Sequence, residues 1–255
     1  MRSRVEAIVL PLALGALVLL VWSLAVRWTG TRIFPAPMKV VSGAMELVHR
    51  GVLLRYVRDS LLRVGAGYSL AVLLGVPLGA WMGWSPTTAT VMNPVVQLLR
   101  PISPIAWIPV AIVFFGVGNL APVFLVFLGS FFPIVLTAMN GVHNVPQMYV
   151  RAARNFGMSP TSILLRVVLP AALPQILTGL RIALGIAWLV VVAAEMIAVD
   201  SGLGYLIIDA RNAGKRYDLV VAGMLLIGLV GLALDIAVRR VEKLRALRWG
   251  YAVER

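Results

Sequence analysis

The sequence predicts an all-α membrane protein with about six transmembrane helices. Hydrophobic residues make up 60% of the 255 residues and charged residues 13%, and the mean hydropathy is +0.94. Residues 7–26, 64–99 and 101–150 contain no Asp, Glu, Lys or Arg, and about 20 apolar residues suffice to cross a hydrocarbon core. Because these runs are continuous rather than alternating, they predict helices, which satisfy their own backbone groups in lipid, rather than barrel strands.

The expected helices form one membrane domain. We place them at residues 7–27, 61–83, 90–116, 119–140, 172–199 and 218–239. The first is too long for a typical signal-peptide core and no small-residue cleavage site follows it, so we interpret it as a retained span. We expect residues 1–60 to hold this helix and an interfacial periplasmic segment, residues 61–240 the main transmembrane domain, and residues 241–255 a basic cytoplasmic tail.

The charges gather where a membrane surface attracts them. The net charge is +13, and the basic residues lie mainly at the ends of the predicted spans and in the tail. This distribution favours anionic lipid headgroups, and not nucleic acid, as the partner. The basic residues of the loops narrowly favour a cytoplasmic position for both termini. Cysteine is absent, which excludes disulfides and thiol chemistry.

A stripe of small residues marks the second span. Its members recur every four residues and are Gly67, Ala71, Gly75, Gly79 and Gly83. On a helix this spacing places them on one face, where small residues let a second helix approach closely.

The polar stretch RAARNFGMSPTSILLRVVLP, residues 151–170, interrupts the apolar chain. Gly157 fits the position that ends a helix with a positive φ. Ser159 fits an N-cap, and Pro160 fits the first helical position after it. The stretch therefore predicts a helix, a turn and a second helix. The residues alone leave two functions open: an interfacial cover for the bundle, or a rigid docking element for a soluble partner.

The spacing in this stretch resembles the cytoplasmic motif of ABC importer permeases. That motif consists of Glu-Ala-Ala, three residues, Gly, nine residues, Ile, one residue and Leu-Pro. The matching positions here are Arg151, Ala152, Ala153, Gly157, Val167, Leu169 and Pro170. Arg151 departs from the motif because it puts a positive charge where the family has a carboxylate. Residues 98–119, 129–135 and 173–196 also resemble the nitrate/sulfonate/taurine branch of that family.

The resemblance implies a type I ABC importer permease that functions as a homodimer in the bacterial inner membrane. Two cytoplasmic ATPase subunits would bind ATP and Mg²⁺, an extracytoplasmic solute-binding protein would deliver a small oxyanion or organic sulfonate, and this chain would hold no cofactor. The coupling segment would be residues 145–170. The residues assigned to ATPase coupling are Arg151, Ala152, Ala153, Arg154, Gly157, Ser159, Leu169 and Pro170.

The candidate translocation residues are polar or aromatic side chains in the apolar runs. They are Arg100, Ser103, Trp107, Ser130, Thr178 and Glu195. A charge in lipid is costly, so Arg100 should either face a water-filled path or cap carbonyls freed by the neighbouring prolines. Ser130 and Thr178 would donate hydrogen bonds either to an oxyanion or to neighbouring helices. Glu195 is expected to pair with Arg63, which lies at a similar depth.

No enzymatic constellation appears in the sequence. It contains no HExxH, GxSxG or P-loop motif, so we do not expect this chain to hydrolyse ATP. Two other functions remain open: an ion-gradient transporter, which typically couples through midplane acids, and a non-transporting scaffold. The substrate is also open among nitrate, taurine, an alkanesulfonate, bicarbonate and a neutral pyrimidine.

Overall fold

The computed structural model describes residues 4–30, 34–212 and 214–242, and all regular structure in these ranges is helical. Five described helices are long and apolar enough to cross a membrane, or six if one bent pair counts as a span. The five are Val9–Thr29, Val52–Trp84, Leu120–His143, Pro160–Ala198 and Tyr217–Arg240. The predicted basic tail, residues 241–255, lies outside the described residues except for its first two positions.

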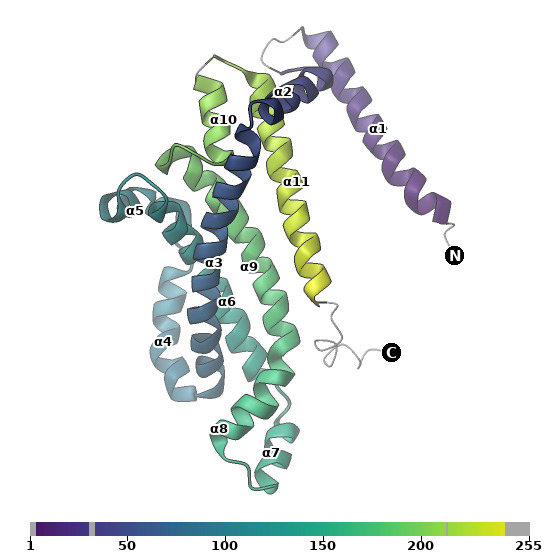
Figure 1. The fold of residues 1–255 in the computed structure, drawn as a ribbon. Coiled ribbons are helices and arrows are strands. Elements are labelled where there is room, and N and C mark those ends of the chain that lie inside the picture. The colour runs from purple at the N-terminus through teal and green to yellow at the C-terminus, as the bar shows by residue number, and fades with distance from the viewer. Residues whose placement is uncertain (1–3, 31–33, 213, 243–255) are drawn as a thin grey trace.

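The centre of the bundle consists of three long helices, α3 (Val52–Trp84), α6 (Leu120–His143) and α9 (Leu169–Ala198). In Figure 1, α3 and α6 run side by side in the same direction, and α9 returns against both of them. Their shared interfaces bury alanine, valine and leucine side chains such as Ala71, Leu125 and Ala183, which are fully buried. This core positions the segments at the two ends of the bundle.

The remaining helices surround this core. Helix α11 (Tyr217–Glu242) lies along α9, and α10 (Leu203–Asn212) packs between the end of α9 and the start of α11. Helix α1 (Arg4–Thr29) stands apart from the bundle and reaches it through α2 (Pro37–His49), as Figure 1 shows. Helix α2 occupies the segment where the sequence predicts an interfacial helix.

The predicted third span, residues 90–116, is wrong as a single helix. The chain forms α4 (Pro86–Leu99), then a short 3-10 helix at Pro104–Trp107 that continues into α5 (Ile108–Phe115). The two parts bend by 82°. The physical reason lies in Pro101 and Pro104. Pro101 has no N–H to continue the hydrogen bonds of α4, and Ser103, the residue before Pro104, leaves helical geometry with a ψ of 131°.

Two predicted helix starts also need correction. The second span begins at Val52 and not at residue 61, because Gly51 adopts a φ of 68° and starts the helix there despite the charges that follow. The fifth span begins at Pro160 and not at residue 172. A π-helical turn at Leu164–Val168 precedes Pro170, and this wider turn accommodates a proline that cannot donate a backbone hydrogen bond.

The predicted small-residue stripe forms the contact between α3 and α6. A Cβ built on Gly79 would overlap the carbonyl oxygen of Val135, and one built on Gly67 would lie 2.5 Å from that of Val123. Gly67 and Gly79 are separated along the chain by as many residues as their partners Val123 and Val135. The two helices therefore run parallel, and each residue of α3 faces α6 at a constant offset. The backbones approach too closely for any side chain larger than hydrogen at these positions.

Replacing Gly79 with alanine should lower the stability of the purified protein by about 1–3 kcal/mol, because the added methyl group forces the two backbones apart. Gly65→Ala is the matched control, since no atom lies within 4 Å of a Cβ at that helical position and alanine favours a helix. Thermal unfolding in detergent micelles measures both. Equal midpoints for the two variants would show that the close α3–α6 contact does not exist.

Candidate functional site

The stretch at residues 147–170 forms a hairpin that projects from one end of the bundle (Figure 1). Its first helix is α7 (Gln147–Asn155), and Gly157 follows with a φ of 76°. The N–H of Gly157 donates to the carbonyl of Arg154 at 2.9 Å, and the N–H of Met158 donates to that of Ala153 at 3.2 Å. This pair of bonds is the Schellman motif, which requires a left-handed residue at the glycine position.

The second helix of the hairpin starts as the sequence predicts. The side chain of Ser159 accepts a hydrogen bond from the backbone N–H of Ser162 at 3.4 Å, and Pro160 occupies the first position of α8 (Pro160–Ile163). Helix α8 continues through the π turn into α9. The hairpin is therefore joined to the bundle core by a continuous helical segment.

The hairpin has its own small core and an outward face. Val150, Ala153, Ile163 and Val168 are buried between its two helices and the end of the bundle. The outward face carries a large aromatic side chain, since Phe156 is 87% exposed. Of the predicted coupling residues, Ala153 is buried and Leu169 half-buried. The exposed ones are Arg151, Ala152, Arg154, Gly157, Ser159 and Pro170.

The outward face is also basic. Arg151 and Arg154 are exposed, and within residues 4–30, 34–212 and 214–242 neither guanidinium has an ion-pair partner. Residues 146–170 contain no Asp or Glu. The hairpin thus combines exposed cations with an exposed aromatic ring on a rigid support, which is a composition enriched in protein–protein interfaces.

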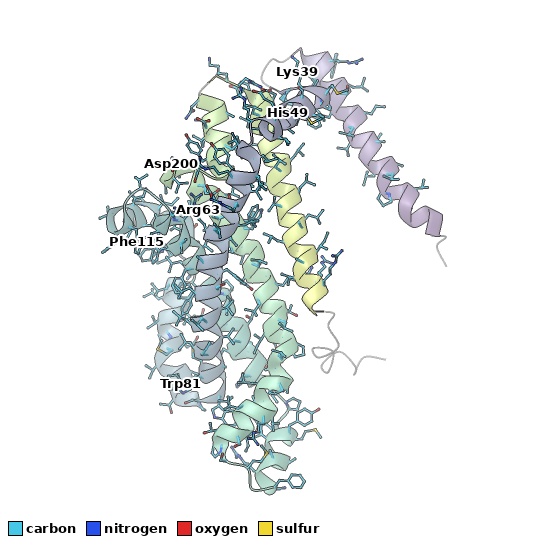
Figure 2. The ribbon with its side chains drawn as sticks, viewed as in Figure 1. Lys39, His49, Arg63, Trp81, Phe115 and Asp200 are labelled. Carbon is cyan, nitrogen blue, oxygen red and sulfur yellow. The ribbon has the colours of Figure 1, made fainter. Side chains whose placement is uncertain are left out.

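A buried ion pair joins α3 to α9 in the half of the bundle away from the hairpin, as the sequence predicts. Nη1 of Arg63 lies 2.7 Å from Oε1 of Glu195, and the two side chains are 4% and 0% exposed. Nη2 of Arg63 also donates to Oδ1 of Asn119 at 2.6 Å and to Oγ of Ser201 at 2.7 Å. Figure 2 shows Arg63 close to Asp200, the residue before Ser201.

The second carboxylate oxygen of Glu195 also accepts hydrogen bonds. Its Oε2 accepts from the hydroxyl of Ser60 at 2.8 Å and from the backbone N–H of Gly204 at 3.0 Å. A side chain at Gly202, whose φ is 106°, would overlap this carboxylate. The pair therefore closes a network that ties α3, the start of α6, α9 and the loop before α10 into one unit.

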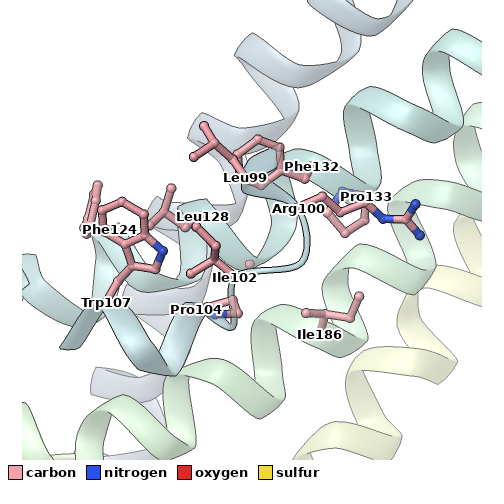
Figure 3. A pocket seen from close by; sticks show the side chains of 11 residues that line it. Leu99, Arg100, Ile102, Pro104, Trp107, Phe124, Leu128, Phe132, Pro133 and Ile186 are labelled. Atoms are coloured by element: carbon pink, nitrogen blue, oxygen red, sulfur yellow. The ribbon is translucent and has the colours of Figure 1, made fainter. Parts of the chain in front are cut away.

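The bend between α4 and α5 forms one wall of a pocket of about 390 Å³. Arg100 and Trp107 line it together with Phe124, Phe132 and Ile186. Figure 3 shows the rings of Trp107 and Phe124 at one end and Arg100 at the other, with its guanidinium directed away from Trp107. Within the described ranges this guanidinium makes no hydrogen bond to the carbonyls near the prolines.

The other translocation candidates are not among the residues that line this pocket. The hydroxyl of Ser130 is fully buried and donates to the carbonyl of Val126 at 2.8 Å. Thr178 is exposed on α9 and donates to the carbonyl of Pro174 at 3.1 Å. Ser103 precedes the 3-10 helix at the bend. The structure thus places Arg100, Ser103 and Trp107 at the bend, whereas the hydroxyls of Ser130 and Thr178 bond to carbonyls of their own helices and Glu195 belongs to the ion-pair network.

Sequence reasoning missed the partners of the ion pair, namely Ser60, Asn119 and Ser201. Asn119 is the residue before α6 and Ser201 lies in the loop before α10, so their distance from Arg63 along the chain gives no indication of contact. Ser60 lies one turn before Arg63 within α3, and its contact is with Glu195, 135 residues further along the chain. The one feature of the sequence that could have indicated these hydrogen-bond partners is that polar residues flank the predicted spans at the depth of Glu195. No group of three or more His, Asp or Glu residues able to hold a metal ion occurs in the described part of the chain.

Comparison with known proteins agrees with these features. The family model described as a binding-protein-dependent transport system inner membrane component matches residues 75–246. The taurine transport system permease protein TauC of Escherichia coli is 35% identical over 91% of this chain and 87% of TauC. The nitrate import permease protein NrtB of Leptolyngbya laminosa is 36% identical over 90% of this chain and 85% of NrtB.

The fold is also shared with a solved transporter. An inward-facing structure of the MetNI methionine ABC transporter matches with a TM-score of 0.66 at 20% identity, covering 76% of this chain and 95% of that chain. The family match spans more than half of the 255 residues. The chain therefore belongs to the family of binding-protein-dependent transport system inner membrane components, and it is a multi-pass permease subunit of an ABC importer with the type I fold.

Proposed function

We propose that this permease works as a homodimer, with an ATPase subunit docked on the hairpin of each copy and a solute-binding protein at the opposite face. The observation that carries the proposal is the hairpin, residues 147–170, with its exposed Phe156 and with Arg151 and Arg154, which have no ion-pair partner in the described part of the chain. The coupling segment of residues 145–170 would then be the surface on which ATP-driven closure of the ATPases acts. ATP hydrolysis itself belongs to the partner subunit.

The continuity of α8 and α9 supports a mechanical role for the hairpin. Pro160–Ala198 forms one span-length helical segment, and at 1.5 Å per residue Glu195 lies about 50 Å along it from Pro160. A displacement of the hairpin is therefore carried into the ion-pair network at the other end. Alternating access would follow if the two hairpins of the dimer approach when ATP binds and separate when ADP and phosphate leave.

The charge of the hairpin specifies the docking partner. Arg151 and Arg154 present two exposed cations, and no acid lies within residues 146–170. Like-charge contact across an interface costs several kcal/mol, whereas complementary charge steers the partners together. A permease with the glutamate of the motif would suit an ATPase that carries a cation at the contact. Because this chain has Arg151 there, we expect its ATPase to carry an acidic residue opposite Arg151.

The same placement defines the orientation that we propose. ATP is cytoplasmic, so the hairpin end of the bundle would face the cytoplasm. Helix α1 begins and α11 ends in the direction of the hairpin end (Figure 1), so both termini would also be cytoplasmic. Residues 1–60 would then place α2 at the periplasmic surface, and the tail at residues 241–255 would be cytoplasmic.

A small oxyanion or organic sulfonate is the substrate class that we propose. Taurine and nitrate, which the related permeases carry according to their names, share a group of negatively charged oxygens. Arg100, Ser103, Trp107 and Thr178 are the side chains we assign to the path, since each is at least partly exposed in this chain. Ser130 and Glu195 are fully buried, so we propose that they act through helix packing.

Replacing Arg100 with alanine should slow uptake of an oxyanion substrate several-fold and leave the complex assembled. The guanidinium supplies a positive charge beside the pocket and has no partner in the described part of the chain whose loss would unfold the protein. Arg58→Ala, an exposed cation on α3, is the control. If Arg100→Ala dissociates the complex in size-exclusion chromatography, or if uptake is unchanged, Arg100 is not a pathway residue.

Reconstitution tests the function as a whole. The permease, its ATPase and the solute-binding protein are placed in liposomes, and ATP hydrolysis and uptake are measured with taurine and with nitrate. The proposal predicts that the loaded binding protein stimulates hydrolysis and that uptake needs ATP inside the reconstituted cytoplasmic compartment. Uptake driven by an ion gradient without ATP would favour a secondary transporter, and a complex that never transports would favour a scaffold.

A further inference from the structure

A second pocket, of about 490 Å³, lies where the end of α1, the residues before α2 and the start of α11 meet. Val26, Phe34 and Pro35 form an apolar part of its lining, and Lys39 and Lys215 supply two ammonium groups. Figure 2 places Lys39 at the end of the molecule far from the hairpin. Neither the coupling hairpin nor the ion-pair network uses this pocket.

The pocket carries a net positive charge. Asp218 also lines it, but its carboxylate pairs with Arg216 at 2.8 Å, and Arg216 in turn pairs with Glu46 of α2 at 2.6 Å. The hydrogen bond from Arg216 holds the pKa of Glu46 below its usual value, so Glu46 stays charged at neutral pH and remains paired with this arginine. Within the described ranges, the ammonium groups of Lys39 and Lys215 have neither an ion pair nor a side-chain hydrogen bond.

The backbone holds Lys215 at the pocket in an unusual conformation. Its φ is 53°, and it is the one non-glycine residue with a positive φ in the described part of the chain. The carbonyl of Lys215 accepts from the N–H of Tyr217 at 2.9 Å, and the N–H of Arg216 donates to the carbonyl of Ala210 at 2.9 Å. Such a conformation persists only where the surroundings impose it, and it concentrates at functional positions.

The pocket lies at the depth of lipid headgroups. The apolar spans Val9–Thr29 and Tyr217–Arg240 both have an end beside it, and tryptophan and tyrosine collect at this boundary. Trp28 is 93% exposed, and Tyr217 lines the pocket. The two lysines are therefore placed at the membrane–water boundary, and Val26 lies on the hydrocarbon side of them.

Trp22 of α1 packs behind the apolar wall of the pocket. The rings of Trp22 and Phe34 have centroids 5.6 Å apart, and the indole N–H of Trp22 is buried without an acceptor in the described part of the chain. Phe34 lines the pocket, so Trp22 extends its apolar wall towards α1. A ligand that fits this site would thus combine an anionic group with an apolar body.

We propose that this pocket binds an anionic phospholipid, with its phosphate between Lys39 and Lys215 and its acyl chains against α1. Lysine ammonium groups bind phosphate as point charges, and no small anion matches the apolar wall. The bound lipid would connect α1 to α2 and α11. This connection matters because α1 otherwise stands apart from the bundle (Figure 1).

Lipid retention by the intact importer complex tests the proposal. The complex is exchanged into nanodiscs of phosphatidylglycerol or of phosphatidylcholine, and native mass spectrometry counts the lipids kept after release from the nanodisc. We expect phosphatidylglycerol to be retained and to raise the unfolding temperature relative to phosphatidylcholine. The double variant Lys39→Gln with Lys215→Gln should lose this retention at least fivefold. The control Arg58→Gln with Arg211→Gln removes two exposed cations elsewhere on the chain and should retain lipid as before.

Three results would overturn the proposal. The first is equal retention of phosphatidylglycerol by the lysine double variant and the parent. The second is the same stabilisation in phosphatidylcholine nanodiscs by soluble glycerol phosphate or inorganic phosphate, which would define an anion site and not a lipid site. The third is unchanged lipid retention with loss of stimulation by the solute-binding protein, which would make the lysines a protein-docking surface.

Discussion

Arg63→Ala should destabilise the permease by about 3–5 kcal/mol, because it leaves the carboxylate of Glu195 buried without its charged partner. Glu195 is 0% exposed, and its ion pair with Arg63 is 2.7 Å long. The loss also removes the hydrogen bonds from Arg63 to Asn119 and Ser201. Thermal unfolding of the purified complex in nanodiscs measures the effect as a lower midpoint.

The double variant Arg63→Met with Glu195→Met distinguishes a charge pair from simple packing. Replacing both members by apolar side chains leaves no buried charge, so the double variant should be more stable than Arg63→Ala alone. Arg58→Ala, on the exposed side of the same helix, should leave the midpoint unchanged. The single variants Arg63→Met and Glu195→Met complete the comparison, and a double variant whose loss equals the sum of these two losses would mean that the two charges do not interact.

Gly157→Val should reduce ligand-stimulated ATP hydrolysis and uptake about tenfold or more, while the permease itself still folds. Gly157 has a φ of 76°, a conformation that costs an L-residue roughly 1–2 kcal/mol and a β-branched one more. No atom lies within 4 Å of a Cβ at this position, so the effect comes from the backbone of the turn. The measurement is hydrolysis and uptake in proteoliposomes with the partner subunits.

Gly51→Val is the control for this variant. Gly51 has a φ of 68° and equally open surroundings, but it lies before α3 at the opposite end of the bundle. The same backbone strain is therefore introduced away from the hairpin, and the coupling of hydrolysis to uptake should survive. Equal loss of coupling in the two variants would indicate general destabilisation and would remove the hairpin from the mechanism.

Local signals explain what the sequence predicts correctly. The hairpin depends on Gly157, Ser159 and Pro160, whose backbone and side-chain bonds span only a few residues. The small-residue stripe of α3 predicts a close partner helix for a similar reason, since it needs only the helical period. The Arg63–Glu195 pair is predictable because a membrane penalises any unpaired charge at that depth.

The errors arise where distant contacts or several competing preferences decide the structure. The chain around Pro101 is apolar on both sides, so hydropathy gives no sign that α4 ends at Leu99 and turns by 82°. Hydropathy also places the start of α3 too late, because the charged first turns of that helix resemble a loop. The sequence does not show that Asn119 would reach Arg63, since that contact depends on how α3 and α6 are rotated against each other.

The most direct test of the account asks where the hairpin lies and what covers it. The chain contains no cysteine, so Phe156→Cys introduces a single thiol on the exposed tip of the hairpin, and Arg211→Cys places one on α10 as a control. We predict that a membrane-impermeant maleimide labels Phe156→Cys only from the cytoplasmic side, that the assembled ATPase blocks this labelling, and that Arg211→Cys is labelled only from outside. Labelling of Phe156→Cys from the exterior, or equal labelling with and without the ATPase, would contradict the proposed coupling role.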